Sequence, residues 1–148
     1  MKKISQSPFC PEKINTLKKN EIFIFGSNEN GNHYGGAARI AYEKFGATWG
    51  QAVGWSGNTY AIPTLNKKMQ KVSKDKLTSY LTELFNNIRD VKYKAYKFYL
   101  TKIGCGIAGW SIEEVCCCIK RALMIVFGKD DEIPNNLFIP KDFVKFLK

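Results

Sequence analysis

The chain has 148 residues, the size of one domain, and 45% hydrophobic with 24% charged residues is the composition of a folded globular protein. No apolar run approaches the roughly 20 residues of a membrane-spanning helix, and no apolar block of signal-peptide length follows the basic start, so we expect a cytoplasmic protein. The formal net charge of +10 predicts long-range attraction of an anionic partner and leaves its identity open.

The first 19 residues are polar and contain Pro8 and Pro11. We expect Phe9, Ile14 and Leu17 to fold back onto the core from this segment. No linker separates it from the rest of the chain, so one domain spanning residues 1–148 is predicted.

A buried strand is predicted at residues 22–25, a continuous run of β-branched and aromatic side chains. Small and turn-forming residues come next: Gly26, Ser27, Asn28, Gly31, Gly35 and Gly36. From Gly36 on, apolar residues recur at three-to-four spacing, which predicts a helix that stops near Gly46. Strand, glycine loop and helix N-terminus in this order favour anion binding, although such a turn can also serve tight packing alone. The stretch is neither a P-loop nor a dinucleotide fingerprint.

A turn at residues 57–58 precedes a short strand, 59–62, which Pro63 is expected to end. An amphipathic helix comes after it, with Ser73 as its N-cap and apolar residues at helical spacing through Ile88. The densest basic cluster lies before and at the start of this helix and comprises Lys67, Lys68, Lys71, Lys74 and Lys76. Without interleaved aromatic residues it indicates a solvated surface more than a nucleic-acid platform.

A second strand–glycine loop–helix unit is predicted after residue 95. The strand covers residues 96–103 and the loop 104–109. Ser111 and Glu114 make a capping box for a helix that reaches Gly128.

A last short strand is expected at 137–139, before a C-terminal tail, 141–148, that docks through Phe143, Phe146 and Leu147. Strands alternating with helices predict a three-layer α/β domain, a mixed but mostly parallel sheet flanked by helices. In such sheets ligands bind outside the carboxyl ends of the strands, where both glycine loops fall. Two such loops can clasp a diphosphate from opposite sides.

The five cysteines are an odd number, and Cys116, Cys117 and Cys118 are consecutive, which favours a reducing compartment over a disulfide framework. Consecutive helical positions point about 100° apart, so these thiols cannot converge on one zinc ion, and no metal site is predicted. We expect core-facing small residues with one exposed thiol.

With both loops in view, the chain resembles the macro-domain superfamily, most closely a branch of small macro-like proteins found in phage and bacterial genomes. The matching runs are NEIFIFGSN at 20–28, HYGGAA at 33–38, FGATWGQ at 45–51, YAIPT at 60–64 and TKIGCGIAG at 101–109. The resemblance implies a macro-like fold and an ADP-ribose-type ligand, with no cofactor.

The resemblance also implies which residues contact the ligand. Gly26 and Ser27 would lead into the site, Asn28 would meet the distal ribose, and Trp110 would lie near that ribose or serve only helix packing. Phosphate would face two loops, formed by Gly35, Gly36 and Ala37 and by Gly104, Cys105, Gly106, Ile107, Ala108 and Gly109. His33, the only histidine, is either a ligand contact or a plain hydrogen-bonding residue.

Two departures from the family pattern bear on function. No aspartate occurs at residues 14–16, where many members have one that accepts a hydrogen bond from the adenine amino group. The identity of the ligand's nucleobase is therefore left open. The carboxylate pair of the glycohydrolase branch is also missing. Asn28 and His33 remain as catalytic candidates, while Cys105 lacks an evident base and fits better as a small residue whose N–H faces phosphate.

Three functions are compatible with these features, in order of preference. The first is a module that binds an ADP-ribose-type nucleotide and captures a nucleotide signal, as a phage-borne antagonist of host defence would. The second is an ADP-ribosyl hydrolase in which Asn28 positions a water. The third is a basic nucleic-acid-binding domain that uses the +10 charge.

Overall fold

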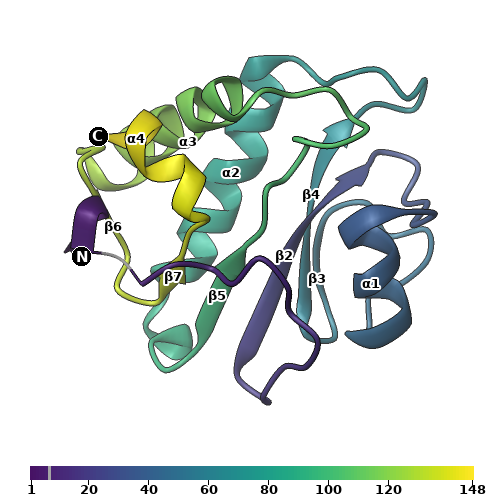
Figure 1. Ribbon diagram of the computed structural model, residues 1–148, viewed down its shortest axis with the longest axis horizontal. Helices are drawn as coiled ribbons and strands as arrows, with labels where there is room; N and C mark the ends of the chain where they lie inside the picture. The colour runs from purple at the N-terminus through teal and green to yellow at the C-terminus, as the bar shows by residue number, and fades with distance from the viewer. Residues whose placement is uncertain (7) are drawn as a thin grey trace.

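The computed structural model describes residues 1–6 and 8–148 and has an α/β architecture built on a five-stranded sheet (Figure 1). The strands, in sheet order, are β3 (Gly54–Ser56), β4 (Thr59–Leu65), β2 (Glu21–Asn28), β5 (Lys97–Leu100) and β7 (Leu137–Phe138). Only β3 runs antiparallel to its neighbour, so the predicted mixed, mostly parallel sheet is confirmed. A separate two-stranded pair joins β1 (Lys2–Lys3) to β6 (Glu132–Ile133).

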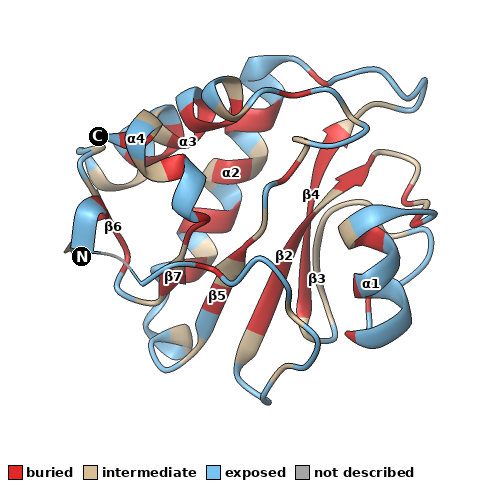
Figure 2. Ribbon diagram, viewed as in Figure 1, coloured by how far each residue is buried: buried red, intermediate tan, exposed pale blue. Residues whose placement is uncertain are grey.

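Helices cover both faces of this sheet and complete a three-layer domain (Figure 1). They are α1 (Gly36–Lys44), α2 (Lys74–Ile88), α3 (Ile112–Phe127) and the short α4 (Val144–Leu147). Side chains of β2 alternate between the faces: Phe23 and Phe25 join a small core under α1, and Ile22 and Ile24 join the larger core under α2 and α3. Figure 2 shows the buried residues following the strands and the inner sides of the helices.

Side-chain caps begin two of the long helices as predicted. Ser73 accepts a bond from the Lys76 amide at the start of α2. At α3, the Ser111 hydroxyl accepts from the Glu114 amide while the Glu114 carboxylate accepts from the Ser111 amide, both at 3.0 Å. α3 ends at Gly128 in the left-handed conformation.

Several strand boundaries differ from the prediction. β2 continues through Asn28, so its last three residues belong to the sheet rather than to the loop. The expectation that Pro63 ends β4 is wrong, because the strand passes through it to Leu65. β3 pairs with β4 only as far as Ala61, so the missing N–H of Pro63 falls where β4 has no partner on that side. β5 ends at Leu100, before the predicted limit.

The two ends of the chain pack against the domain. Ile14 and Leu17 reach the core under α1, but Phe9 is 43% exposed, so its expected burial is wrong. In the tail, Phe143 and Leu147 are fully buried, which confirms their docking. Phe146 packs at the margin of the larger core.

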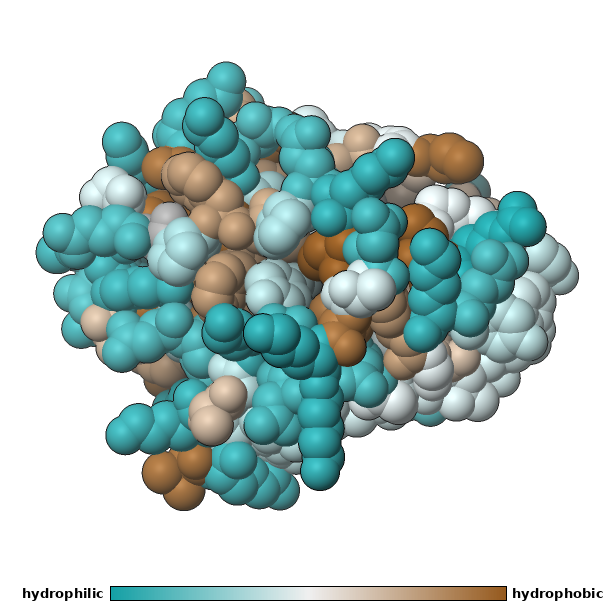
Figure 3. Space-filling model, turned by 60° about the horizontal axis from the view of Figure 1, so that its bottom comes forward, coloured by the Kyte–Doolittle hydropathy of each residue, from teal (hydrophilic) through white to brown (hydrophobic). Residues whose placement is uncertain are grey.

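The three consecutive cysteines also agree with the prediction, since Cys116 and Cys118 are buried and Cys117 is exposed. Within residues 1–6 and 8–148, no helix has the length and apolar character needed to cross a membrane. The same residues bring no three His, Cys, Asp or Glu side chains together in a way that would hold a metal ion. The face in Figure 3 is mostly hydrophilic, with apolar side chains in patches between the charged ones.

Candidate functional site

Both glycine loops lie at the edge of the sheet where the parallel strands β2, β4 and β5 end, the upper edge in Figure 1. The first loop, 29–35, leads from β2 to α1, and the second loop, 101–111, leads from β5 to α3. The second loop crosses close to β2, because a Cβ on Gly26 would lie 3.1 Å from the Gly104 nitrogen. This is the position at which α/β sheets bind ligands.

Asn28 and Ser27, both predicted ligand contacts, are buried residues of β2 that hold neighbouring loops in place. The Asn28 Nδ2 donates to the Asn32 carbonyl, and its Oδ1 accepts from the amides of Asn30 and Asn32. The Ser27 hydroxyl donates to the Ala52 carbonyl at 2.5 Å. Both ends of the Asn28 side-chain amide are therefore engaged by the backbone of the first loop.

His33 belongs to the first loop, but its side chain packs among aromatic rings and the residue is only 2% exposed. Its Nε2 is 2.9 Å from the Thr48 carbonyl and carries a proton, since a carbonyl oxygen only accepts. Its Nδ1 is buried and has no partner among the residues that the structure describes. The ring meets Phe25 and Trp49 edge-on, which places His33 among packing contacts.

The N-terminus of α1 is open to solvent. Gly35 occupies the N-cap position in extended backbone and offers no side-chain cap. In the described part of the chain, the amides of Gly36, Ala37 and Ala38 have no hydrogen-bond acceptor. A Cβ added to Gly35 or Gly36 would meet no atom within 4 Å, so a ligand can approach this backbone. The helix dipole adds a partial positive charge at this point.

The tip of the second loop is open in a similar way. Ile107 is fully exposed, and a Cβ on Gly106 or Gly109 would meet no atom within 4 Å. Among the described residues, nothing accepts a hydrogen bond from the amides of Gly106, Ile107 and Ala108. These three N–H groups can serve an anionic oxygen.

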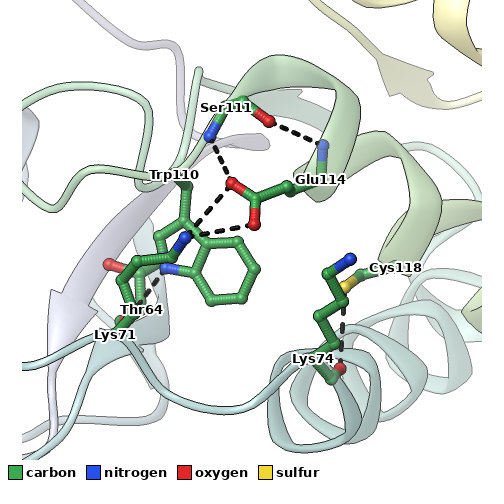
Figure 4. Close-up of polar contacts among 7 residues, drawn as sticks. All are labelled: Thr64, Lys71, Lys74, Trp110, Ser111, Glu114 and Cys118. Atoms are coloured by element: carbon green, nitrogen blue, oxygen red, sulfur yellow. Dashed lines mark hydrogen bonds and ion pairs between the residues drawn. The ribbon is translucent and has the colours of Figure 1, made fainter.

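Trp110, by contrast, is a buried packing residue at the end of the same loop (Figure 4). Its indole N–H donates to the Thr64 carbonyl of β4 at 3.0 Å, and the Lys71 ammonium covers its ring at 4.7 Å from the centroid. A Cβ on Gly104 would lie 2.7 Å from the indole, and Gly104 has φ +72°. Glycine is required there so that Trp110 can approach the loop.

The N-terminus of α3 is closed by charge as well as by its capping box. Lys71 Nζ lies 3.1 Å from both carboxylate oxygens of Glu114 (Figure 4). The bond from the Ser111 backbone, with the Lys71 ammonium, lowers the pKa of Glu114 from its ordinary value of 4.5 to about 2. An ionised carboxylate thus occupies the place where a ligand anion would bind this helix.

The Cys105 thiol is half-buried at the base of the second loop and donates to the Ile103 carbonyl at 3.4 Å. Burial raises the pKa of this thiol, which disfavours the reactive thiolate. The structure therefore gives Cys105 no activation as a nucleophile.

Sequence reasoning missed a polar hollow beside the first loop. Glu29, Lys76 and Tyr80 line it together with the turn 66–70, at the carboxyl ends of β2 and β4. The spacing of apolar residues in α2 accounted for Tyr80 as a packing residue. Tyr80 is also 51 residues away from Glu29 in the sequence. Local sequence carries no signal for this pairing.

A scan against protein-family models found no matching family, and a search of curated proteins found no matching relative. Function is therefore inferred from the geometry of the site together with the motif resemblance.

Proposed function

We propose that this chain binds an ADP-ribose-type nucleotide, with its diphosphate held between the N-terminus of α1 and the tip of the second glycine loop. One observation carries the proposal: each place presents three backbone amides without an acceptor in the described chain, Gly36 to Ala38 and Gly106 to Ala108. Open space over Gly35 and Gly106 lets ligand oxygens reach this backbone. Amide bonds to ionised phosphate are charge-assisted and therefore strong.

The class of ligand comes from the resemblance to macro domains, and it agrees with the charge of the protein. A net charge of +10 attracts an anionic nucleotide at long range. In this proposal the domain captures a nucleotide signal, as a phage-borne antagonist of host defence would.

An ADP-ribosyl hydrolase is the second function to test, because Asn28 at the end of β2 and His33 on the first loop both precede the α1 amides in the chain. Both side chains are buried, and the Asn28 side-chain amide is engaged by the backbone of the first loop. General acid–base catalysis needs a proton carrier within reach of the reacting atom. Backbone amides that bind the ground state and the transition state equally give affinity but do not accelerate a reaction. We therefore rank ligand capture above hydrolysis.

Calorimetry with ADP-ribose and adenosine tests the proposal directly. We expect ADP-ribose to bind and adenosine to bind far more weakly, because the amides recognise the diphosphate. Gly106→Val should abolish ADP-ribose binding and leave the fold intact, since Gly106 faces open space and does not have a positive φ. Equal affinity for the two ligands, or normal binding by a folded Gly106→Val, would contradict the proposal.

Two further measurements separate the alternatives. Chromatography of ADP-ribose conjugates after incubation with excess protein should recover them unchanged, whereas turnover lost in Asn28→Ala would favour the hydrolase. Affinity for an oligonucleotide that falls steeply with salt and exceeds that for ADP-ribose would favour nucleic-acid binding.

A further inference from the structure

The polar hollow beside the first loop lies at the carboxyl ends of β2 and β4 and uses none of the glycine-loop amides. Its volume is about 610 Å³, within the range of small-molecule sites. Its lining is mostly polar or charged and includes Glu29, Lys67, Lys68, Lys76 and Tyr80.

Glu29 provides a fixed hydrogen-bond acceptor in this hollow. Tyr80 Oη donates to its Oε2 at 2.6 Å, and Lys76 Nζ lies 2.6 Å from the same oxygen. The bonds from Lys76 and Tyr80 lower the pKa of this carboxyl, so it is ionised at neutral pH. No described residue donates to Oε1, which leaves one carboxylate oxygen for a ligand. Carboxylates held in this way accept hydrogen bonds from sugar hydroxyls.

Lys67 and Lys68 add positive charge to the hollow, and Lys67 lies near enough to Glu29 to help lower the pKa of its carboxyl. Both are exposed, and neither forms an ion pair within residues 1–6 and 8–148. Lys76 is paired with Glu29, so the hollow retains two positive charges outside the described ion pairs for an anion. Lysine ammonium groups commonly bind phosphate as point charges.

The turn that carries these two lysines is held in a defined conformation. The Asn66 side chain accepts from the amides of Lys68 and Gln70, and its backbone N–H donates to the Gln70 carbonyl. Asn30 of the first loop donates to the Lys67 carbonyl at 3.0 Å. Met69 has φ +61°, a strained conformation for a residue with a side chain, and such strain often occurs at functional sites.

We propose that this hollow binds a sugar phosphate, with the phosphate on Lys67 and Lys68 and a sugar hydroxyl on the Glu29 carboxylate. Two cations outside the described ion pairs and one free carboxylate oxygen match a ligand that carries an anion and a hydrogen-bond donor. The site stands apart from the nucleotide function proposed above, because its contacts are side chains of different residues.

Calorimetric titration with ribose 5-phosphate, inorganic phosphate and ribose tests this assignment on the intact protein. Ribose 5-phosphate should bind saturably and more tightly than inorganic phosphate or ribose. Lys67→Ala/Lys68→Ala should weaken its binding at least tenfold. The matched control is Lys13→Ala/Lys94→Ala, which removes the same charge from exposed positions outside the hollow and should change affinity less than twofold.

Glu29→Gln separates the two parts of the site. It should weaken ribose 5-phosphate binding several-fold and leave inorganic phosphate unchanged or tighter, because a negative charge is removed. Gly106→Val should retain ribose 5-phosphate binding even if ADP-ribose binding is lost, so the two proposals fail independently. Absence of saturable binding, an equal loss in the control pair, or parallel loss of both ligands in Glu29→Gln would overturn the assignment.

Discussion

The two strand–glycine loop–helix units of this protein look alike in sequence and differ in how their helices begin. In the first unit, α1 starts at an uncapped glycine, and its first amides are free among the described residues. In the second, α3 starts with the Ser111–Glu114 capping box, and Lys71 neutralises the carboxylate. Only the first helix N-terminus is therefore available to an anion, and the second unit contributes only its loop tip.

The glycines of the two units also fall into two groups, those that packing requires and those that face open space. Gly26 and Gly104 allow chain segments to approach each other, because a Cβ at either position would press on the neighbouring segment. Gly35 and Gly106 face open space. A glycine-rich loop thus combines positions that packing requires with positions that leave room for a ligand, and only the environment distinguishes them.

The largest change in stability is expected when the packed and the open glycine of the second loop are each replaced by alanine. Gly104→Ala should destabilise the protein by roughly 1–3 kcal/mol, because the new methyl group meets the Trp110 indole and φ is positive. Gly106→Ala is the matched control and should change stability by less than about 0.5 kcal/mol. Urea unfolding measures both. Equal stabilities of the two variants would remove the distinction between packing and open glycines.

The capped N-terminus of α3 should make the stability of the protein depend on pH in the acid range. The pKa of Glu114 is lowered to about 2 in the folded state, so its contribution to stability is present above its ordinary value of 4.5 and is lost as pH falls toward 2. Glu114→Gln should therefore reduce stability at pH 6 and converge with the parent protein near pH 2. Unfolding midpoints across this range provide the measurement, and a constant difference between the two proteins would contradict the assignment.

The smallest change in stability is expected at the open helix. Gly35→Asp introduces a capping carboxylate at a position with extended backbone, and it should stabilise α1 by a few tenths of a kcal/mol. The same carboxylate would occupy the amides proposed for phosphate, so ADP-ribose affinity should fall at least tenfold. Gly35→Asn, a cap without charge, separates occupancy from repulsion. Full ADP-ribose affinity in a folded Gly35→Asp would exclude α1 from the site.

The sequence predicted the fold well where local chemistry decides it. The strand at the centre of the sheet, the Ser73 cap, the capping box at Ser111 and the Gly128 stop are all explained by residue type and spacing. The prediction at Pro63 was wrong because a strand can contain proline where no neighbouring strand pairs with that residue, and β3 does not reach Pro63. β3 has no pattern of its own and forms by pairing with β4.

Less of the candidate site than of the fold could be predicted from the sequence. The two glycine loops were recognisable, and the structure places them at one edge of the sheet. Two properties of the site depend on the folded structure: Lys71 covers Trp110, and the backbone of the first loop engages the Asn28 side chain. The Glu29–Tyr80 pair joins residues from different elements, which no spacing rule connects.

The margins of the sheet bear on whether a second chain could pair with its edges. β3 and β7, the outer strands, have three and two residues, and they present little unpaired backbone to another chain. Beyond β7, the Cys10 amide donates to the Ile139 carbonyl, and Phe9 pairs with Ile139, so the N-terminal segment occupies part of that edge. Edge-to-edge addition of a second copy is thereby disfavoured, and removing residues 1–10 is the change that would expose a template for aggregation.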